Sequence, residues 1–366
     1  MVTIKTRHGQ FRFSQQRFYD PDTGEGFSYL EYTAQNQESV GLQEWVCYLA
    51  NRMSYHEVVK EVERVTGVIL LSAPRMQQLV IDKASIISQG QRQNAQQVLA
   101  QDQGLPVVAE KIDVYDPQSN EVLMFCDGVC VKRQKGQRPR PVQARSEDEA
   151  KRVNTDVVML QQPSGEYSYL MAGLAAPTEP SLPLSELVKA RLIETYGQCS
   201  HPLNLVAITD GARHIRLLLE QVLGPALTII LDWYHLRKKC VELMSMIARN
   251  KSEKVMHLQS ILAYLWHGQT QQARAYLKTE VVPRNATKLS ELLTYLDKHT
   301  SEIIDYDKRQ KAGNPIGSGR MEKGIDLTVA QRQKRKSMSW SDTGSHALAL
   351  LKTVELNHQW HTLWAF

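Results

Sequence analysis

Three aspartates in this 366-residue chain lie on or directly after short apolar runs that are typical of buried strands. Asp127 lies within "EVLMFCDGVCVKR", Asp210 ends "PLNLVAITD" and Asp232 ends "ALTIILD". Carboxylates held close together either share a proton or bind a cation, and oxygen ligands suit Mg²⁺ or Mn²⁺. Two such ions can activate a hydroxyl nucleophile and stabilise the leaving oxygen of a phosphodiester. The candidate chemistry is therefore metal-dependent cleavage of a phosphate backbone.

Two further residues complete the candidate site. Glu322 offers a third carboxylate, because it opens a helix after the glycine-rich turn "AGNPIGSGRME". His235 follows Asp232 by three residues at the start of a basic helix. The competing interpretation is structural, since acids after strands commonly cap the next helix by accepting its free N–H groups. Spacing alone leaves both interpretations open for each aspartate.

The elements around these acids predict an α/β fold. Strands are expected at 121–133, at two places within 156–174 around the turn "PSGE", at 202–211 and at 226–232, with helices at 183–197 and 212–224. Right-handed crossovers then place the fourth strand beside the first, on the side away from the hairpin. Asp127 and Asp210 would therefore face each other at the topological switch point, where ligand sites form. Asp232 would lie one strand further out.

The amino-terminal part is predicted to contain a small β-rich segment followed by helices. In "SYHEVVKEVERVTG", Ser54 and Glu57 form a capping box and Gly67 is a helix stop. Ser72 can cap a long polar helix after a short link, which gives the shape of a helix-turn-helix. A three-helix packing unit without DNA contact fits the same pattern.

The predicted organisation has six parts. They are a β-rich segment at 1–40, a helix-turn-helix-like domain at 41–105, the first part of the sheet domain at 106–236, an all-helical insertion at 237–312, the final helix of the sheet domain at 313–352, and a tail at 353–366. That final helix is expected to begin near Ser318 and to run into "QRQKRKSMSWS".

Positive charge is clustered beside the candidate ligands, although the formal net charge is only +5 at pH 7. The basic residues expected to contact DNA phosphates are Lys132, Arg133, Lys135, Arg138, Arg140, Arg320, Lys323, Arg332, Lys334, Arg335 and Lys336. A basic run is usually a solvated face. The basic residues up to Arg140 follow Asp127 in the sequence, and those from Arg320 onward surround or follow Glu322. Both basic groups therefore adjoin proposed acidic ligands, as a phosphate-backbone substrate would require.

The cysteines and the apolar runs predict the compartment. Five cysteines are scattered along the chain, and the first residues contain no secretory apolar core. No run approaches the roughly 20 apolar residues that cross a bilayer. We therefore expect a reduced, cytoplasmic protein that does not enter a membrane.

The ordered motifs "CDGV", "ITDGARHI", "LDWYHLRKK", "GSGRMEKG" and "SWSDTGSHALALLK" resemble bacterial insertion-sequence transposases with a DDE active site, of the ISKra type and related to Mutator-like transposases. The resemblance spans about residues 8–352. It implies an RNase H-like core, with a mixed five-stranded sheet and flanking helices, that is interrupted by the helical insertion and preceded by a mainly helical DNA-binding domain.

The resemblance also implies a function and residue roles. Asp127, Asp210 and Glu322 match the three acids that hold Mg²⁺ or Mn²⁺ for DNA strand cleavage and transfer. Asp232 and His235 match an Asp-x-x-His motif, in which His235 steadies the site or contacts DNA and Asp232 orients it. Asp232 as the second metal ligand stays an open alternative.

The implied partners are the terminal inverted repeats of the element and target DNA, bound by a homo-oligomer at the nucleoid. Two other functions compete with this one. One is a metal-dependent nuclease or resolvase of the same fold, without strand transfer. The other is a domesticated DNA-binding protein whose acids only cap helices.

Overall fold

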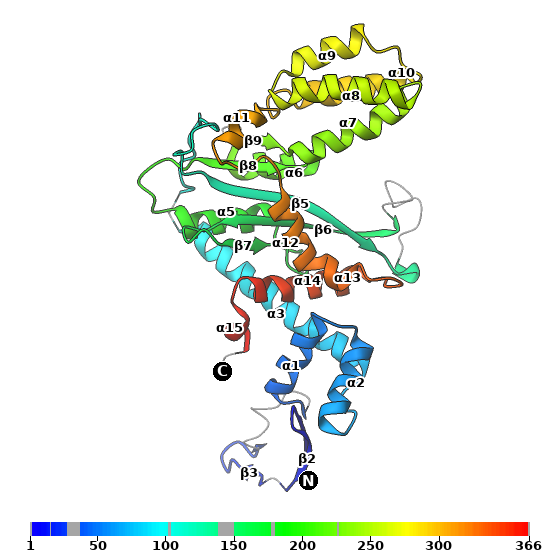
Figure 1. The fold of residues 1–366 in the computed structure, drawn as a ribbon. Coiled ribbons are helices and arrows are strands. Elements are labelled where there is room, and N and C mark those ends of the chain that lie inside the picture. Colours follow the sequence, from blue (N-terminus) through cyan, green and yellow to red (C-terminus); the bar gives the residue numbers. More distant parts are fainter. Residues whose placement is uncertain are drawn as a thin grey trace.

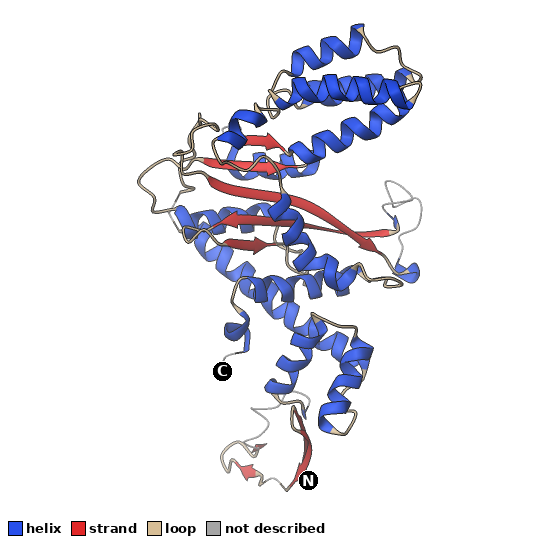
Figure 2. Ribbon diagram, in the orientation of Figure 1, coloured by secondary structure: helices blue, strands red, loops and turns tan. Residues whose placement is uncertain are grey.

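A five-stranded mixed sheet with helices on both faces forms the centre of the molecule (Figures 1 and 2). The structure is a computed structural model that describes residues 2–14, 16–27, 37–101, 104–137, 150–176, 180–224 and 227–364. The strands lie in the order β7-β6-β5-β8-β9. Their bounds are Val122–Lys132 (β5), Arg152–Gln161 (β6), Tyr167–Leu170 (β7), Leu205–Thr209 (β8) and Thr228–Leu231 (β9). The predicted α/β class and strand order are confirmed.

The pairing between β5 and β8 ends partway along β5, because β8 is the shorter strand. β5 runs antiparallel to β6 and parallel to β8, with Cys126 opposite Thr209 as the last pair between β5 and β8. β8 ends there, whereas β5 continues to Lys132. Asp127 therefore lies inside a strand and cannot cap a helix, so the capping interpretation is wrong for this residue.

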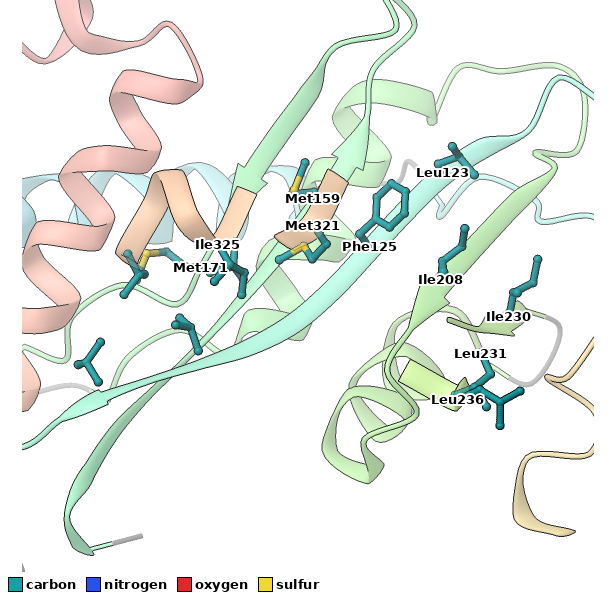
Figure 3. Close-up of a cluster of buried hydrophobic side chains, with 14 of the residues drawn as sticks. Leu123, Phe125, Met159, Met171, Ile208, Ile230, Leu231, Leu236, Met321 and Ile325 are labelled. Carbon is teal, nitrogen blue, oxygen red and sulfur yellow. The ribbon is translucent and has the colours of Figure 1, made fainter. Parts of the chain in front are cut away.

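Alternating side chains give the sheet two different faces, because successive residues of a strand point in opposite directions. Met124, Val158 and Ala207 pack under α5 (Leu184–Tyr196) and α6 (Arg213–Leu223). Phe125, Val157 and Ile208 belong to the core of the other face, which Figure 3 shows together with Leu236 and Met321 from two helices. Asp127 shares the alternation of Phe125 and faces this second layer.

The helix that carries Glu322 lies across this second face. α12 (Gly319–Ile325) buries Met321 completely and Ile325 almost completely against β5 and β6 (Figures 1 and 3). A β-carbon at Gly324 would stand 2.3 Å from the Met159 sulfur, which shows how closely this helix approaches the sheet.

The single final helix predicted from the sequence is wrong. α12 continues through a π-helical turn at Asp326–Ala330 into α13 (Gln331–Gln333), where the helix ends. A turn then leads to α14 (Asp342–Leu356), and Trp340 pairs with Arg133 at the end of β5. Because the Trp340 backbone joins that strand, the chain cannot continue as a helix through the basic run.

The chain between β9 and α12 is all-helical and forms an insertion that projects beyond the β9 edge of the sheet (Figure 1). Its helices are α7 (Trp233–Ile247), α8 (Lys251–Trp266), α9 (Thr270–Thr279), α10 (Ala286–Lys298) and α11 (Tyr306–Lys311). The Trp233 ring lies 4.8 Å from that of Trp266 and 5.1 Å from that of Tyr306. The Tyr306 hydroxyl donates to the carbonyl of Leu231 at 2.8 Å. These contacts fix the insertion to the sheet edge.

The amino-terminal part contains two short antiparallel strand pairs followed by helices. β1 (Val2–Thr6) pairs with β2 (Gly9–Phe13), and β3 (Phe18–Tyr19) pairs with β4 (Gly26–Phe27). α1 (Val40–Ala50), α2 (Tyr55–Thr66) and α3 (Ala73–Ala100) follow. The capping box of Ser54 and Glu57 is present, and Gly67 ends α2 with φ of 76°.

α3 belongs to both the amino-terminal unit and the sheet domain. Its first half packs on α1 and α2, whereas Ala95 in its second half packs on Leu187 of α5. α14 also packs along α3. One 28-residue helix therefore joins the two units without an intervening linker.

The carboxyl-terminal segment folds back onto the amino-terminal unit. The Trp360 indole in α15 (Trp360–Trp364) donates to Glu44 of α1 at 2.8 Å. Within the described ranges, no helix is both long and apolar enough to cross a bilayer.

Candidate active site

The sheet register brings Asp127 and Asp210 side by side. Each residue directly follows the last pair between β5 and β8, Cys126 with Thr209. Asp232 follows β9, one strand further out, where Leu231 pairs with Thr209. The predicted placement of all three aspartates in the sheet is confirmed.

The charges of neighbouring acids act on Asp127. Burial raises the pKa of its carboxyl above the usual value, and the negative charges of Asp210 and Glu322 raise it further. The Gly128 N–H, which donates to Oδ1 at 2.7 Å, and the charge of His235 act in the opposite direction. A carboxyl destabilised by two like charges is a position where a bound cation would be favoured.

Asp210 and Glu322 keep oxygens available for a ligand. Asp210 Oδ1 accepts from the Ala212 N–H at 2.8 Å, but the cap residue of α6 is Ala212, so Asp210 does not cap that helix. The Glu322 carboxylate is exposed in the first turn of α12. It makes no hydrogen bond or ion pair with any residue whose placement the structure describes.

Asp232 is different, because both of its oxygens are occupied. Oδ1 accepts from the N–H groups of Tyr234 at 2.6 Å and His235 at 3.0 Å, which caps α7. Oδ2 accepts from the N–H of Ser318 at 2.5 Å and from its hydroxyl. Burial acts to raise the pKa of Asp232, yet the hydrogen bonds from His235 and Ser318 lower it to about 2. The capping interpretation thus applies to this aspartate.

Asp232 also fixes the turn that leads into the Glu322 helix. A β-carbon at Gly317 would stand 2.6 Å from the Tyr234 ring and 3.4 Å from Asp232 Oδ2. Only glycine permits this approach, so the turn Gly317–Ser318 is held directly against the start of α7. The geometry therefore favours Asp210 over Asp232 as the second metal ligand.

His235 lies beside Asp232 and interacts with the charges of Asp210 and Asp127. Its Nδ1 is 3.5 Å from Asp232 Oδ2 and is buried without a hydrogen-bond partner in the described part of the chain. The Asp232 carboxylate raises the pKa of the imidazole, burial opposes this, and Asp210 and Asp127 raise it further. The ring can therefore carry a positive charge that offsets the negative charge of the site.

The three proposed ligands do not form a compact cluster. Among the residues described, only His267, Asp305 and Asp307 bring three such ligand atoms within 4.8 Å of one another. That group is already engaged, because Asp305 caps α11 and Asp307 accepts from Lys311 at 2.6 Å. The charges of Asp210 and Glu322 both raise the pKa of Asp127, so Asp127 is the residue that interacts with each of the other two proposed ligands.

Sequence reasoning missed a buried charged group behind Asp210. His299 and Glu302 are almost fully buried, with His299 Nδ1 2.5 Å from Glu302 Oε2, and Arg216 contacts both. A β-carbon at Gly211 would stand 2.8 Å from His299 Cε1. The glycine after the acid in "ITDG" was the available signal of a close approach.

Gly211→Ala is expected to lower stability and displace Asp210. Gly211 has φ of 82°, where a side chain is strained, and the added methyl would meet His299 and Leu231 at 2.8 Å. Strain and overpacking together should cost about 2–4 kcal/mol. Urea unfolding measures this, with Gly165→Ala as the control, because Gly165 has φ of 84° and nothing within 4 Å. Equal losses in the two variants would contradict the proposed contact.

The predicted DNA-binding residues divide into exposed and engaged groups. Lys132, Lys135, Arg320, Lys323, Lys334, Arg335 and Lys336 are exposed. Arg138 and Arg140 lie outside the described residues. Arg133 pairs with Asp342 at 2.7 Å, and Arg332 is only 5% exposed and donates to the Ala50 carbonyl. Arg332 is therefore not the surface cation that the basic run suggested, and Arg133 holds α14 to β5.

No protein-family model matches the chain, and no curated protein matches it.

Proposed function

We propose that the chain is a Mg²⁺- or Mn²⁺-dependent DDE transposase that cleaves and joins DNA at the ends of an insertion sequence. The proposed RNase H-like core is the sheet β7-β6-β5-β8-β9, whose first three strands are antiparallel and whose last two run parallel to β5. One observation carries the proposal. Asp127 stands in mid-strand, where it caps nothing, and the charges of Asp210 and Glu322 both raise its pKa.

The donor set suits hard divalent cations. Asp127, Asp210 and Glu322 offer carboxylate oxygens. The repulsion between the charge of Asp127 and those of the other two acids favours binding of a cation. Asp127 would be shared, with Asp210 on one side and Glu322 on the other. Bound ions supply charge neutralisation at the phosphate and a more acidic water or hydroxyl nucleophile.

Other side chains would position these acids and the DNA. Asp232 holds the turn before α12 and so sets the position of Glu322. His235 offsets negative charge at the acids. Arg320 and Lys323 flank Glu322 on the exposed side of α12, where they could contact a phosphate near the site.

Neutralising Lys334 and Lys336 together to Gln is expected to weaken binding to specific and random duplex DNA alike. Both side chains are exposed in the turn after α13. Phosphate contacts carry no sequence information, and each lost contact flattens the slope of log affinity against log salt by about 0.9. The double variant should therefore shallow that slope by up to about 2. Titrations at several salt concentrations measure it, and an unchanged slope would place this turn away from DNA.

Lys251→Gln combined with Lys254→Gln is the matched control for that experiment. These lysines lie in α8 of the helical insertion, away from the sheet and the acids (Figure 1). The same number of charges is removed, so the net charge changes equally. The control should leave the salt slope unchanged.

The decisive assay for the function supplies the full chain with DNA that carries both ends of the element and a supercoiled target. We expect divalent-cation-dependent nicks at the ends, followed by joined products. Cleavage without joining would indicate a nuclease or resolvase. Binding without either product would indicate a DNA-binding protein that has lost catalysis.

The proposal includes a homo-oligomer assembled on the two ends, in the bacterial cytoplasm at the nucleoid. The helices α2 and α3 would contribute recognition of the terminal repeats. Crosslinking with and without DNA ends tests the assembly.

A further inference from the structure

A cavity lies at the junction between the amino-terminal helices and the segment after α13. Its volume is about 440 Å³, within the range of small-ligand sites. The start of α2, the start of α3 and residues 337–341 surround it. Its lining includes Tyr55, His56, Pro74, Arg332, Met338 and Trp340. None of the proposed metal ligands lines this cavity.

The cavity is lined by a buried cation, Arg332, that has no counterion among the residues the structure describes. Arg332 is 5% exposed, its Nε donates to the Ala50 carbonyl at 2.7 Å, and its Nη1 lies 3.4 Å from the Met338 sulfur. No carboxylate in the described ranges forms an ion pair with this guanidinium. Burial lowers the pKa of Arg332, which reflects the cost of desolvating the charge. A buried arginine of this kind would be stabilised by a bound anion.

Aromatic rings hold this arginine in place without neutralising it. The guanidinium carbon lies 5.0 Å from the centre of the Trp340 ring and 5.7 Å from that of Tyr55. Tyr55 lines the cavity, and its hydroxyl is buried and has no hydrogen-bond partner among the residues described. This hydroxyl is therefore, after the Arg332 guanidinium, a second buried polar group that a ligand could satisfy.

Two helices begin at the same cavity, and the first turn of α2 supplies further donors. The Ser54 hydroxyl accepts the N–H of Glu57, and the Ser72 hydroxyl accepts the N–H of Arg75. The Ser54 cap leaves the N–H groups of Tyr55 and His56, in the first turn of α2, without an acceptor in the described part of the chain. Helix starts favour anions through such N–H groups and through the helix dipole.

We propose that this cavity binds a phosphate group through Arg332, the Tyr55 hydroxyl and the first turn of α2. A planar guanidinium suits bidentate contact with a tetrahedral oxyanion. The phosphate comes either from the backbone of a nucleic acid or from a free phosphate or phosphate monoester. The nearby charges are the exposed side chains of His56, Glu57 and Arg335, and Glu57 is already held by the Ser54 N–H at 2.7 Å.

Titration of the full chain with inorganic phosphate, at constant ionic strength and without DNA or divalent cations, tests the site. Calorimetry and the thermal midpoint should both report binding by the wild type. Tyr55→Phe keeps the ring and removes only the hydroxyl, so affinity should fall about tenfold, as for a lost hydrogen bond to a charged group. Arg332→Gln should remove measurable binding. Because Arg332 is buried and its variant can fail to fold, Tyr55→Phe decides the question in that case.

Two control variants lie outside the cavity lining. Tyr48→Phe removes a hydroxyl from a 40% exposed tyrosine of α1, and Arg335→Gln removes an exposed cation next to the site. Both should bind phosphate within about twofold of the wild type, since neither residue lines the cavity. Equal losses in Tyr55→Phe and Tyr48→Phe would overturn the proposal.

Duplex DNA distinguishes the two sources of phosphate. If the cavity takes a backbone phosphate, inorganic phosphate should compete with duplex beyond the effect of ionic strength, and Tyr55→Phe should weaken duplex binding. If it takes a free phosphate, duplex and inorganic phosphate should bind independently. The proposal fails if the wild type binds no inorganic phosphate and Tyr55→Phe leaves duplex affinity unchanged. Because the phosphate titration contains neither DNA nor metal, this failure is separate from a failure of the transposase proposal.

Discussion

Asp127→Asn is expected to reduce DNA cleavage by about 10³-fold or more, because the anionic ligand that we propose to be shared is lost while the size of the side chain is kept. DNA binding should persist, since removing a negative charge cannot weaken attraction to phosphate. Cleavage of an end-bearing duplex and the affinity for the same duplex are measured together. Normal cleavage by this variant would exclude Asp127 from the site.

The same substitution is expected to raise thermal stability in the absence of metal. The folded-state pKa of Asp127 is raised above 3.8. Its ionised form therefore costs stability once the pH exceeds that folded value, whereas below pH 3.8 the cost is absent. The variant should melt above the wild type at pH 7, and the difference should shrink toward pH 3. A loss of stability at pH 7 would mean that Asp127 is favourably paired.

Asp156→Asn is the matched control for both measurements. Asp156 lies on β6 opposite Gly128, the residue that follows Asp127 on β5. Its side chain therefore points to the other face of the sheet. Its carboxylate is 3.3 Å from His214 and is 43% exposed. The same chemical change at this neighbouring position should leave cleavage within a few-fold of the wild type.

Asp232→Asn is expected to destabilise the fold more than Asp210→Asn and to reduce cleavage less. The lowered pKa of Asp232, about 2 against 3.8, corresponds to about 2 kcal/mol in favour of the ionised form. An asparagine amide can satisfy the start of α7 or Ser318, but its NH₂ group cannot accept from the N–H groups at the other position. Urea unfolding should show a loss of about 2–3 kcal/mol.

The pH dependence of this loss has a definite sign. A folded-state pKa below the unfolded value stabilises the protein above pH 3.8, and this contribution is lost as the pH falls through about 2. Asp232→Asn should therefore resemble the wild type more closely near pH 2 than at pH 7. Cleavage by Asp232→Asn should fall roughly tenfold, against 10²-fold or more for Asp210→Asn. Cleavage rates in the reverse order would make Asp232 the second ligand.

Local patterns predicted most of the fold. The apolar run around Asp127 located β5, and the capping box at Ser54 and the stop at Gly67 located α2. The strand and helix order then placed Asp127 beside Asp210, because crossover handedness leaves few arrangements. Each of these features depends on neighbours in the sequence or on a general rule of topology.

The features that the sequence did not predict depend on distant contacts. The basic run predicts that Arg332 is a surface cation. In the structure its side chain donates to the carbonyl of Ala50, 282 residues away. From the sequence, Asp232 fits a helix cap and a metal ligand equally well. The structure shows that Ser318, 86 residues away, donates to its second oxygen. His299 lies behind Gly211 only because the helical insertion returns to the sheet edge. No periodicity or spacing encodes such pairs.

Binding of Mn²⁺ to the full chain without DNA tests the central claim most directly, because it separates ion binding from catalysis. Calorimetric titration of the wild type should show bound Mn²⁺, which Asp127→Asn should lose and Asp156→Asn should retain. Glu322→Gln should lower the stoichiometry or the affinity. Equal Mn²⁺ binding by the wild type, Asp127→Asn and Glu322→Gln would contradict the proposal that these acids hold the catalytic metal.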